Sequence, residues 1–411
     1  MSDGQRVNQA LLEKSLTGVR EFTVDGVLRR WEVLDGPQGP RVRIDGKDLI
    51  MLASNNYLDL MSRPEVHQAA IEAINQYGVG MAAGRTLCGT NALHEKLEAK
   101  LAALSGTDGA LLYHSAYSAN IGAISALAGQ GDMIFSDQLN HASLIDGCRM
   151  SRAVTRIYPH GDMKALESML READAVSPPA AGTATARVRL IVTDGVFSFD
   201  GDLAPLPDIV ELARRYSAAV LCDDAHSAGV MGPTGGGTPE YFGLKGEVDV
   251  ITGTLGKALG GTVGGYVATQ RDVVDYMITH SRSFIFTNAL PPAVVAANIA
   301  VLDLLAGDPS ILARLHSNAR LLRDLLAGAG FELLGSGTPI CPVLLRDSDL
   351  TVRFGRRLFD EGVFAPGFGY PVAPRGQARI RTIMNANLTT EDILFAAAAF
   401  VKVGREMGVV K

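Results

Sequence analysis

Two groups of residues in this sequence have the types and the order needed to hold an aldehyde cofactor that contains a pyridine ring. Lys257 lies in the glycine-rich segment 253–261, and its amine can bond to an aldehyde as a Schiff base. Asp223 ends an apolar segment and is followed by Asp224, Ala225 and His226. A carboxylate at that position keeps a pyridine nitrogen protonated, which makes the ring an electron sink. Together these residues predict a site for pyridoxal phosphate.

The elements that position these residues follow from the apolar pattern. Short apolar segments alternate with helical patterns, such as the one-face spacing of Met163, Leu166 and Leu170. This alternation predicts an α/β fold whose mostly parallel sheet is covered by helices, with ligands bound beyond the carboxyl ends of the strands. The expected strands are Ala110 to Tyr113, Met133 to Phe135, Leu190 to Val192, Ala219 to Leu221, and Val250 to Ile251.

The pattern divides the chain into three parts. We predict an N-terminal segment over residues 1–55 and a large cofactor-binding domain over residues 56–290. A smaller α+β domain over residues 291–411 begins with long Ala- and Leu-rich helices and has strands near 343–345 and 378–381. Residues 177–182, rich in proline and small residues, are predicted to form a surface loop inside the large domain.

The composition excludes several classes of function. The chain of 411 residues is 47% hydrophobic and 20% charged, as in an ordinary globular protein, and its net charge of -6 favours neither nucleic acid nor an anionic membrane. The N-terminus lacks the pattern of a signal peptide, and prolines and polar residues interrupt the apolar stretch 289–306. We therefore expect a cytoplasmic protein with no nucleic-acid, membrane or metal partner.

Each glycine-rich or acidic segment also has an alternative interpretation. Residues 251–258 lack the glycine and the hydroxyl residue of a P-loop, and residues 78–83 match a dinucleotide fingerprint but follow a helical pattern instead of a strand. Lys257 taken alone is typical of a solvated surface lysine. Asp223 and Asp224 could bind magnesium or cap a helix, and a lone His226 is more often structural than catalytic. No single residue decides between these interpretations.

In their order and spacing, the motifs of this sequence resemble those of the α-oxoamine synthases, the pyridoxal phosphate enzymes that condense an amino acid with an acyl thioester. Within that family the chain most resembles the glycine C-acetyltransferases. The resemblance implies the aminotransferase-like fold type I. The motifs that carry it are Asn55 to Leu58, Cys88 to Thr90, Leu139 to Ser143, Thr193 to Ser198, Asp223 to His226, Gly253 to Gly265, and Gly376 to Arg381.

The resemblance assigns roles around the cofactor ring. It implies that Lys257 is the Schiff-base lysine and that Asp223 pairs with the pyridine nitrogen. His226 and Ser198 are expected near the ring hydroxyl. His141 is expected to stack on the ring and to contact the substrate. The catalytic set is therefore expected to be Lys257, His141, Asp223 and His226.

The cofactor phosphate is expected to have ligands from two subunits. Ala116 and Tyr117 would offer backbone N–H groups to the phosphate. They directly precede a helix that we predict to begin at Ser118, and the dipole at the start of a helix favours an anion. Thr254 adds a hydroxyl group. Thr287 and Asn288 match positions that reach the phosphate of the partner subunit in the family. The resemblance therefore implies a homodimer with shared active sites.

Arginine residues near the C-terminal motif are expected to bind the substrate. The resemblance assigns the substrate carboxylate to Arg381, a role that suits a planar guanidinium with two parallel donors. Arg379 lies two residues earlier and would point the same way in a strand, so spacing does not choose between them. Asn55 is a weaker candidate on the substrate side.

The expected reaction joins glycine to acetyl-CoA without loss of carbon dioxide, giving 2-amino-3-oxobutyrate and CoA. In reverse, it would cleave that product in threonine catabolism. Lys257, once displaced by the amino acid, is expected to remove the α-proton, and Asp223 to stabilise the charge that enters the ring. We keep an aminotransferase or lyase on the same fold as an alternative, because fold and cofactor do not fix the reaction.

Three departures from the family pattern leave the substrates open. Asp59 replaces a glycine, Leu388 replaces a histidine, and Ala116-Tyr117 replaces a more common Gly-Phe or Cys-Phe pair. The first two could reshape the substrate pockets, although Asp59 could equally be a neutral surface change. Alanine or serine, and a longer acyl group on CoA or on a carrier protein, therefore remain open as substrates.

Overall fold

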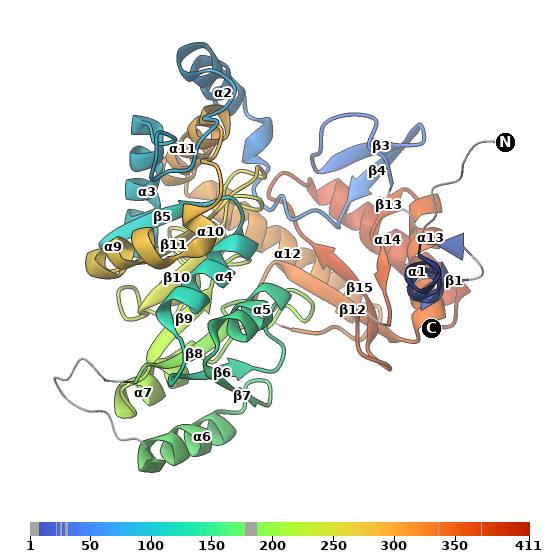
Figure 1. Cartoon of the computed structure of the whole chain (residues 1–411). Coiled ribbons are helices and arrows are strands. Elements are labelled where there is room, and N and C mark those ends of the chain that lie inside the picture. Colours follow the sequence, from blue (N-terminus) through green and yellow to red (C-terminus); the bar gives the residue numbers. More distant parts are fainter. Residues whose placement is uncertain are drawn as a thin grey trace.

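The computed structural model describes residues 8–21, 23–24, 27–28, 32–176, 187–335, 337–370 and 372–411. Its centre is a seven-stranded sheet with the strand order β5-β11-β10-β9-β8-β6-β7 (Figure 1). All neighbouring strands are parallel except β11, which is antiparallel to both of its neighbours. The predicted mostly parallel α/β sheet is therefore confirmed. The strands are β5 (Gly109–Tyr113), β6 (Met133–Asp137), β7 (Val154–Tyr158), β8 (Arg189–Asp194), β9 (Ala219–Asp223), β10 (Val250–Thr254) and β11 (Gly265–Thr269).

Helices cover both faces of this sheet because alternate strand residues are apolar on opposite sides. Within β5, Ala110 and Leu112 belong to one core cluster, while Leu111 and Tyr113 belong to the other. The first cluster includes α3 (Ala92–Ser105), α6 (Met163–Val176), α7 (Leu206–Arg215) and α11 (Pro292–Gly307). The second includes α4 (Ala116–Leu127), α5 (Ala142–Ser151), α9 (Arg271–His280) and α10 (Arg282–Ile285).

The C-terminal elements form a second layer beside the large sheet (Figure 1). Here β15 pairs with β12 and β14 in an antiparallel sheet, and the N-terminal β4 pairs with β3 and, in parallel, with β13. Both ends of the chain therefore contribute to this layer. Its elements are β3 (Arg41–Ile44), β4 (Lys47–Met51), α12 (Ser310–Gly328), β12 (Ile340–Arg346), α13 (Ser348–Asp360), β13 (Val363–Phe364), β14 (Gly367–Phe368), β15 (Ala378–Ile383) and α14 (Thr390–Glu406).

Several remaining segments bear on the predicted domain limits. Helix α11 packs against α2 (Pro64–Tyr77) and α3, beside the large sheet. The division at residues 55 and 290 stays a prediction, and the loop predicted at residues 177–182 lies outside the described residues. Shorter elements are α1 (Gln9–Glu21), β1 (Thr23–Val24), β2 (Val27–Leu28), η1 (Leu60–Ser62) and α8 (Thr238–Tyr241). No single helix in the described ranges is long and apolar enough to cross a membrane, and α11 with α12 meets that requirement only as a pair bent by 81°.

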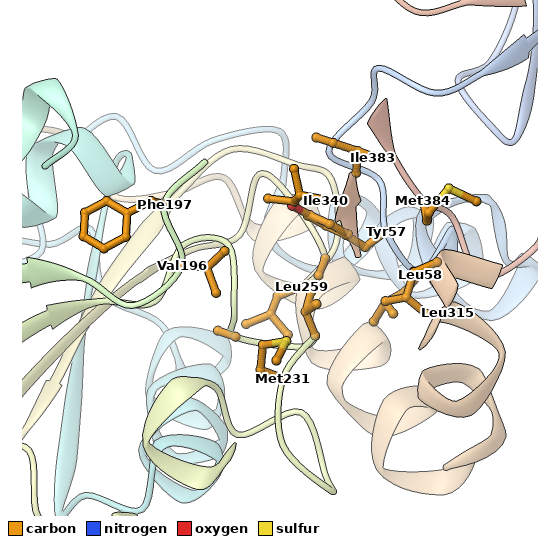
Figure 2. Packing of buried hydrophobic residues seen from close by; sticks show 14 of the residues in the cluster. Tyr57, Leu58, Val196, Phe197, Met231, Leu259, Leu315, Ile340, Ile383 and Met384 are labelled. Carbon is orange, nitrogen blue, oxygen red and sulfur yellow. The ribbon is translucent and has the colours of Figure 1, made fainter. Parts of the chain in front are cut away.

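The core is continuous between the two layers. Figure 2 shows Val196 and Phe197, which follow β8, on one side of the contact and Ile383 and Met384, at the end of β15, on the other, with Tyr57 between them. All of these side chains are buried. The loop after β8 also contacts β15 through a hydrogen bond from Arg381 to the carbonyl of Ser198.

Candidate active site

The candidate residues gather at the carboxyl ends of the parallel strands, where an open α/β sheet binds its ligands. Asp223 ends β9, Asp194 ends β8, and Lys257 follows β10. Because β9 lies between β8 and β10, these three segments are neighbours in the sheet. The charges of Asp223 and Asp194 both raise the pKa of Lys257 against the effect of burial, which places all three groups in one site.

Asp223 has a fixed orientation and is 3% exposed. Its Oδ2 accepts a hydrogen bond of 2.6 Å from Nδ2 of Asn120, and its Oδ1 accepts one of 2.9 Å from the amide of Ala225. Asn120 lies on α4 and is itself held because its Oδ1 accepts from the hydroxyl of Thr252 at 2.6 Å. Within the described ranges no lysine, arginine or histidine forms a salt bridge with Asp223, which leaves this carboxylate available to a protonated pyridine nitrogen.

Lys257 has the properties of a reactive amine. Its side chain is partly buried, and burial lowers its pKa to about 8. No carboxylate in the described part of the chain forms a salt bridge with it. Because only the neutral amine attacks an aldehyde, a lowered pKa raises the fraction that can react near neutral pH. The structure therefore does not support the alternative of a solvated surface lysine.

His141 is anchored next to Asp194. Its amide donates to Oδ2 of Asp194 at 2.7 Å, and its Nδ1 lies 2.7 Å from the hydroxyl of Ser143 in the first turn of α5. Burial lowers the pKa of His141, and the charge of Asp223 acts against that shift. Burial, followed by the charge of Asp223, raises the pKa of Asp194 well above its usual range. The edge of the Tyr117 ring faces the His141 ring at 6.4 Å between centroids.

His226 is buried and neutral. Burial, and then the positive charge of Lys257, hold its pKa well below the usual range. Its Nδ1 lies 2.8 Å from the hydroxyl of Tyr57, and burial raises the pKa of that phenol, so the proton stays on the tyrosine and the hydroxyl donates. The carboxylate of the adjacent Asp224 accepts from the amide of Thr238 at 3.0 Å and so helps to hold the chain after β9 in place. Sequence reasoning gave Tyr57 no role, although it lies in a motif that carried the resemblance.

The expected phosphate position is the start of α4. The helix begins at Ala116 and not at Ser118 as predicted, because the hydroxyl of Ser115 caps it by accepting from the amide of Ser118 at 3.0 Å. The amides of Ala116 and Tyr117 are therefore in the first helical turn, whose N–H groups have no acceptor within the helix. A Cβ on Gly265 would lie 2.3 Å from the nitrogen of Ala116, so only glycine allows β11 to approach this turn.

Thr254 ends β10, and Ser198 lies in the loop after β8. The hydroxyl of Thr254, at the end of β10, accepts from the amide of Gly256 at 3.0 Å. The carbonyl of Ser198 accepts from Arg381 at 3.4 Å. No described hydrogen bond joins the hydroxyl of Ser198 to His226.

The structure separates the two arginines that spacing could not. Arg379 is 1% exposed and pairs with the carboxylate of Asp200, and its guanidinium also donates to Oε1 of Gln377 at 3.0 Å. Arg381 has no carboxylate partner in the described residues, and its Nε is buried without a hydrogen bond. Burial lowers the pKa of Arg381. Its guanidinium lies beside the rings of Phe199 and Phe368, at 5.7 and 5.6 Å from their centroids.

The remaining predicted residues lie farther from this cluster. The hydroxyl of Thr287 donates to the carbonyl of Ser283 at 2.6 Å, and the exposed Asn288 forms a backbone bridge with Gly84. No described contact joins Thr287 or Asn288 to Lys257 of the same chain. Asn55 has a buried Oδ1 without a hydrogen-bond donor.

Two of the departures from the family pattern, Asp59 and Leu388, are buried side chains. Asp59 is buried, so the interpretation of a neutral surface change is wrong. It adopts the left-handed conformation with φ of 53°, which explains why glycine also suits this position. Its carboxylate accepts from Nδ2 of Asn56 at 2.8 Å and from Nδ2 of Asn387 at 3.2 Å. Leu388 is buried in the core cluster.

Comparison with known proteins agrees with this geometry. The family model of class I and II aminotransferases matches residues 47–400. An 8-amino-7-oxononanoate synthase of Thermoanaerobacter pseudethanolicus is 45% identical over 392 residues, which cover 95% of this chain and 97% of the relative. The corresponding enzyme of Symbiobacterium thermophilum is 44% identical over 399 residues, covering 97% and 98%. The chain belongs to the α-oxoamine synthase family.

Solved structures of α-oxoamine synthases share the fold of this chain. A serine palmitoyltransferase of S. paucimobilis, solved with PLP and myriocin, superimposes with a TM-score of 0.90 at 32% identity and covers 98% of this chain and 100% of its own. An 8-amino-7-oxononanoate synthase of Francisella tularensis has a TM-score of 0.72 at 27% identity, with coverages of 87% and 98%. This α-oxoamine synthase is a fold type I acyltransferase, and pyridoxal 5′-phosphate is its cofactor.

The comparisons correct one expectation about the substrates. The predicted likeness to glycine C-acetyltransferases is not supported, because the relatives reported above are 8-amino-7-oxononanoate synthases. The groups of this α-oxoamine synthase suit pyridoxal phosphate: an amine at Lys257, a carboxylate at Asp223, helix amides at Ala116 and Tyr117, and a partly buried guanidinium at Arg381 that pairs with no carboxylate in the described residues.

Proposed function

We propose that this protein condenses L-alanine with a seven-carbon acyl thioester that ends in a carboxylate, releasing carbon dioxide and a thiol. The observation that carries the proposal is the 44–45% identity to 8-amino-7-oxononanoate synthases over nearly the whole chain. The product name fixes the carbon balance. Three carbons of alanine and seven of the acyl group, less one lost as carbon dioxide, give the nine carbons of 8-amino-7-oxononanoate.

The substrate carboxylate is assigned to Arg381. In this proposal the two carboxylate oxygens of alanine bind the guanidinium beside Phe199 and Phe368, where the buried Nε has no hydrogen-bond partner in the described residues. This contact orients the α-carbon toward Lys257. The low-dielectric surroundings strengthen the charge interaction, because water does not compete for the donors.

Lys257 transfers the proton in this proposal, and Asp223 stabilises the charge. Pyridoxal phosphate supplies, when bound, a ring that accepts electrons from the bonds of the α-carbon. Lys257, with its pKa lowered to about 8, takes the α-proton as a neutral amine and can return one later. Asp223, fixed by Asn120, would keep a proton on the ring nitrogen, and His141 would stack on the ring.

We also propose that the protein acts as a cytoplasmic homodimer with shared sites. Thr287 and Asn288 lie at the surface beyond α10 and do not contact Lys257 of their own chain, which supports the assignment to a partner's phosphate site. Phe286 beside them is 72% exposed, as expected of a residue that a second subunit covers.

The test is thiol release by the protein loaded with pyridoxal phosphate. L-alanine, glycine and L-serine are each offered with pimeloyl-CoA and with acetyl-CoA, and a Lys257→Ala variant is the control. We expect release with alanine and pimeloyl-CoA together with the formation of carbon dioxide, and none in the variant. Release only with glycine and acetyl-CoA, or keto-acid formation without thiol release, would replace the proposal by an acetyltransferase or an aminotransferase.

A further inference from the structure

One charged cluster lies just outside the site and has no role in the proposed reaction. His160 follows β7, and both nitrogens of its ring face carboxylates: Nδ1 lies 2.9 Å from Oδ1 of Asp137, and Nε2 lies 2.8 Å from Oδ2 of Asp202. A carboxylate only accepts, so both ring nitrogens must donate and the ring must carry a positive charge. The two contacts raise the pKa of His160 to about 10, which keeps it charged at neutral pH.

The two carboxylates belong to two different loops of the site. Asp137 ends β6, and its Oδ1 also accepts from the amide of Leu139 at 2.8 Å, in the turn that leads to His141. Asp202 closes the loop 197–202, where its carbonyl accepts from the amide of Phe197 at 3.0 Å. The ring of His160 also packs against the edge of Phe197 at 4.4 Å between centroids. His160 therefore joins the turn before His141 to the loop that contains Ser198.

The loop 197–202 in turn holds the candidate carboxylate site. The carbonyl of Ser198 accepts from Arg381, and the ring of Phe199 packs on the guanidinium of Arg381. Asp200 pairs with Arg379, two residues earlier on β15. A shift of this loop would therefore move the groups that orient Arg381.

We propose that His160 is a positioning residue, which fixes the loop 197–202, and with it the carboxylate site at Arg381, by binding Asp137 and Asp202 at the same time. The inference rests on the proposed function in taking Arg381 as the substrate carboxylate site. His160 does not touch the cofactor or the substrate in this assignment. Its loss should therefore weaken amino-acid binding while leaving the attachment of the cofactor at Lys257 intact.

The first experiment measures amino-acid binding through the absorbance of the bound cofactor. We compare the wild type with His160→Gln, Asp202→Asn, the double variant and His67→Gln, whose histidine is exposed on α2 and has no described contact. The Kd for the amino acid should rise about 10-fold in His160→Gln, the scale of a displaced orienting group. Asp202→Asn should have a similar effect, and the double variant should be no worse than the weaker-binding single variant. The His67→Gln variant should match the wild type within about 2-fold, as expected of a surface substitution.

The second experiment measures thermal unfolding of the protein without cofactor at several pH values. The titratable groups in contact with His160 are Asp137 on β6 and Asp202 in the loop. The pKa of His160 is raised in the folded state above its usual 6.5, so the stabilisation is complete below pH 6.5 and is lost as pH rises through about 10. The gap in Tm between wild type and His160→Gln should therefore be largest near pH 6 and close above pH 10.

The outcomes separate this inference from the proposed function. If the wild type bound neither alanine, glycine nor serine, the proposed function would fail, and the unfolding curves would still decide whether His160 is a charged link between the loops. If the wild type bound an amino acid and His160→Gln bound it equally well, the inference would be wrong. A Tm gap independent of pH, or equal losses in His67→Gln, would also overturn it.

Discussion

Replacing Arg381 and Arg379 separately by methionine should have opposite effects on stability. The two side chains lie two residues apart on β15 and are chemically identical, but in the described residues only Arg379 has a carboxylate partner, Asp200. Arg381 is a partly buried cation beside two aromatic rings. Methionine has a similar length and no charge, so it keeps much of the packing while removing the guanidinium.

The expected changes in amino-acid binding and in stability follow from the partners of each arginine. Arg381→Met removes two charge-assisted hydrogen bonds to the amino-acid carboxylate, about 3 kcal/mol in total, which weakens binding roughly 100-fold. Because it also removes a partly buried charge that pairs with no carboxylate in the described part of the chain, it should raise the free energy of unfolding by about 1 kcal/mol. Arg379→Met leaves Asp200 without its cation and should lower the free energy of unfolding by about 2 kcal/mol, since that carboxylate is partly exposed. Amino-acid binding in Arg379→Met should weaken by no more than about 10-fold, through the loop alone.

Two measurements decide the matter. Amino-acid titration followed by cofactor absorbance gives the Kd of each variant, and thermal unfolding of the cofactor-free proteins gives the change in stability. The reasoning fails if Arg381→Met binds the amino acid as tightly as the wild type. It also fails if Arg381→Met is the less stable of the two variants, because the guanidinium would then have an internal partner.

Two further predictions concern the cofactor groups. The rate at which cofactor-free protein captures pyridoxal phosphate should rise with pH and level off above about 8, because burial lowers the pKa of Lys257 to about 8 and only the neutral amine reacts; a stopped-flow absorbance series that keeps rising to pH 10 would contradict this. Asp223→Ala should retain bound cofactor but lose at least about 100-fold in turnover, since a ring without its proton is a much poorer electron acceptor; near-normal thiol release by the variant would refute the assignment.

The fold could be predicted from sequence where a strand is fully buried. The five predicted strands of the large sheet are short continuous apolar segments, and each appears in the structure. Strand β7 was missed because it is an edge strand, in which Val154 and Ile157 are exposed and interrupt the pattern of a buried strand. Strand β11 is also buried, but it was missed because it begins at Gly265 and directly follows the glycine-rich residues 260–264.

Within the site, sequence reasoning proposed groups that lie in contiguous motifs and did not find groups that are fixed by tertiary contacts. Lys257 and Asp223 were predicted because strand and loop patterns place them. Arg381 could not be separated from Arg379, because only packing against Asp200 distinguishes them. Asn120 lies inside a helix without any local signal, yet it orients Asp223. Asp194 and Tyr57 lay within quoted motifs, and their position at strand ends or in buried loops could have drawn attention to them.

The network around Asp59 has a consequence for the order of folding. Its carboxylate receives one amide from Asn56, its neighbour, and one from Asn387, near the end of the chain. The carbonyl of Asn56 likewise accepts from Asn385, and β4 pairs with β13. A nascent chain must therefore be synthesised to residue 387 before the segment that carries Asn55 and Tyr57 is held in place. Such long sequence separation slows folding and leaves the substrate side of the site unformed in any C-terminally truncated product.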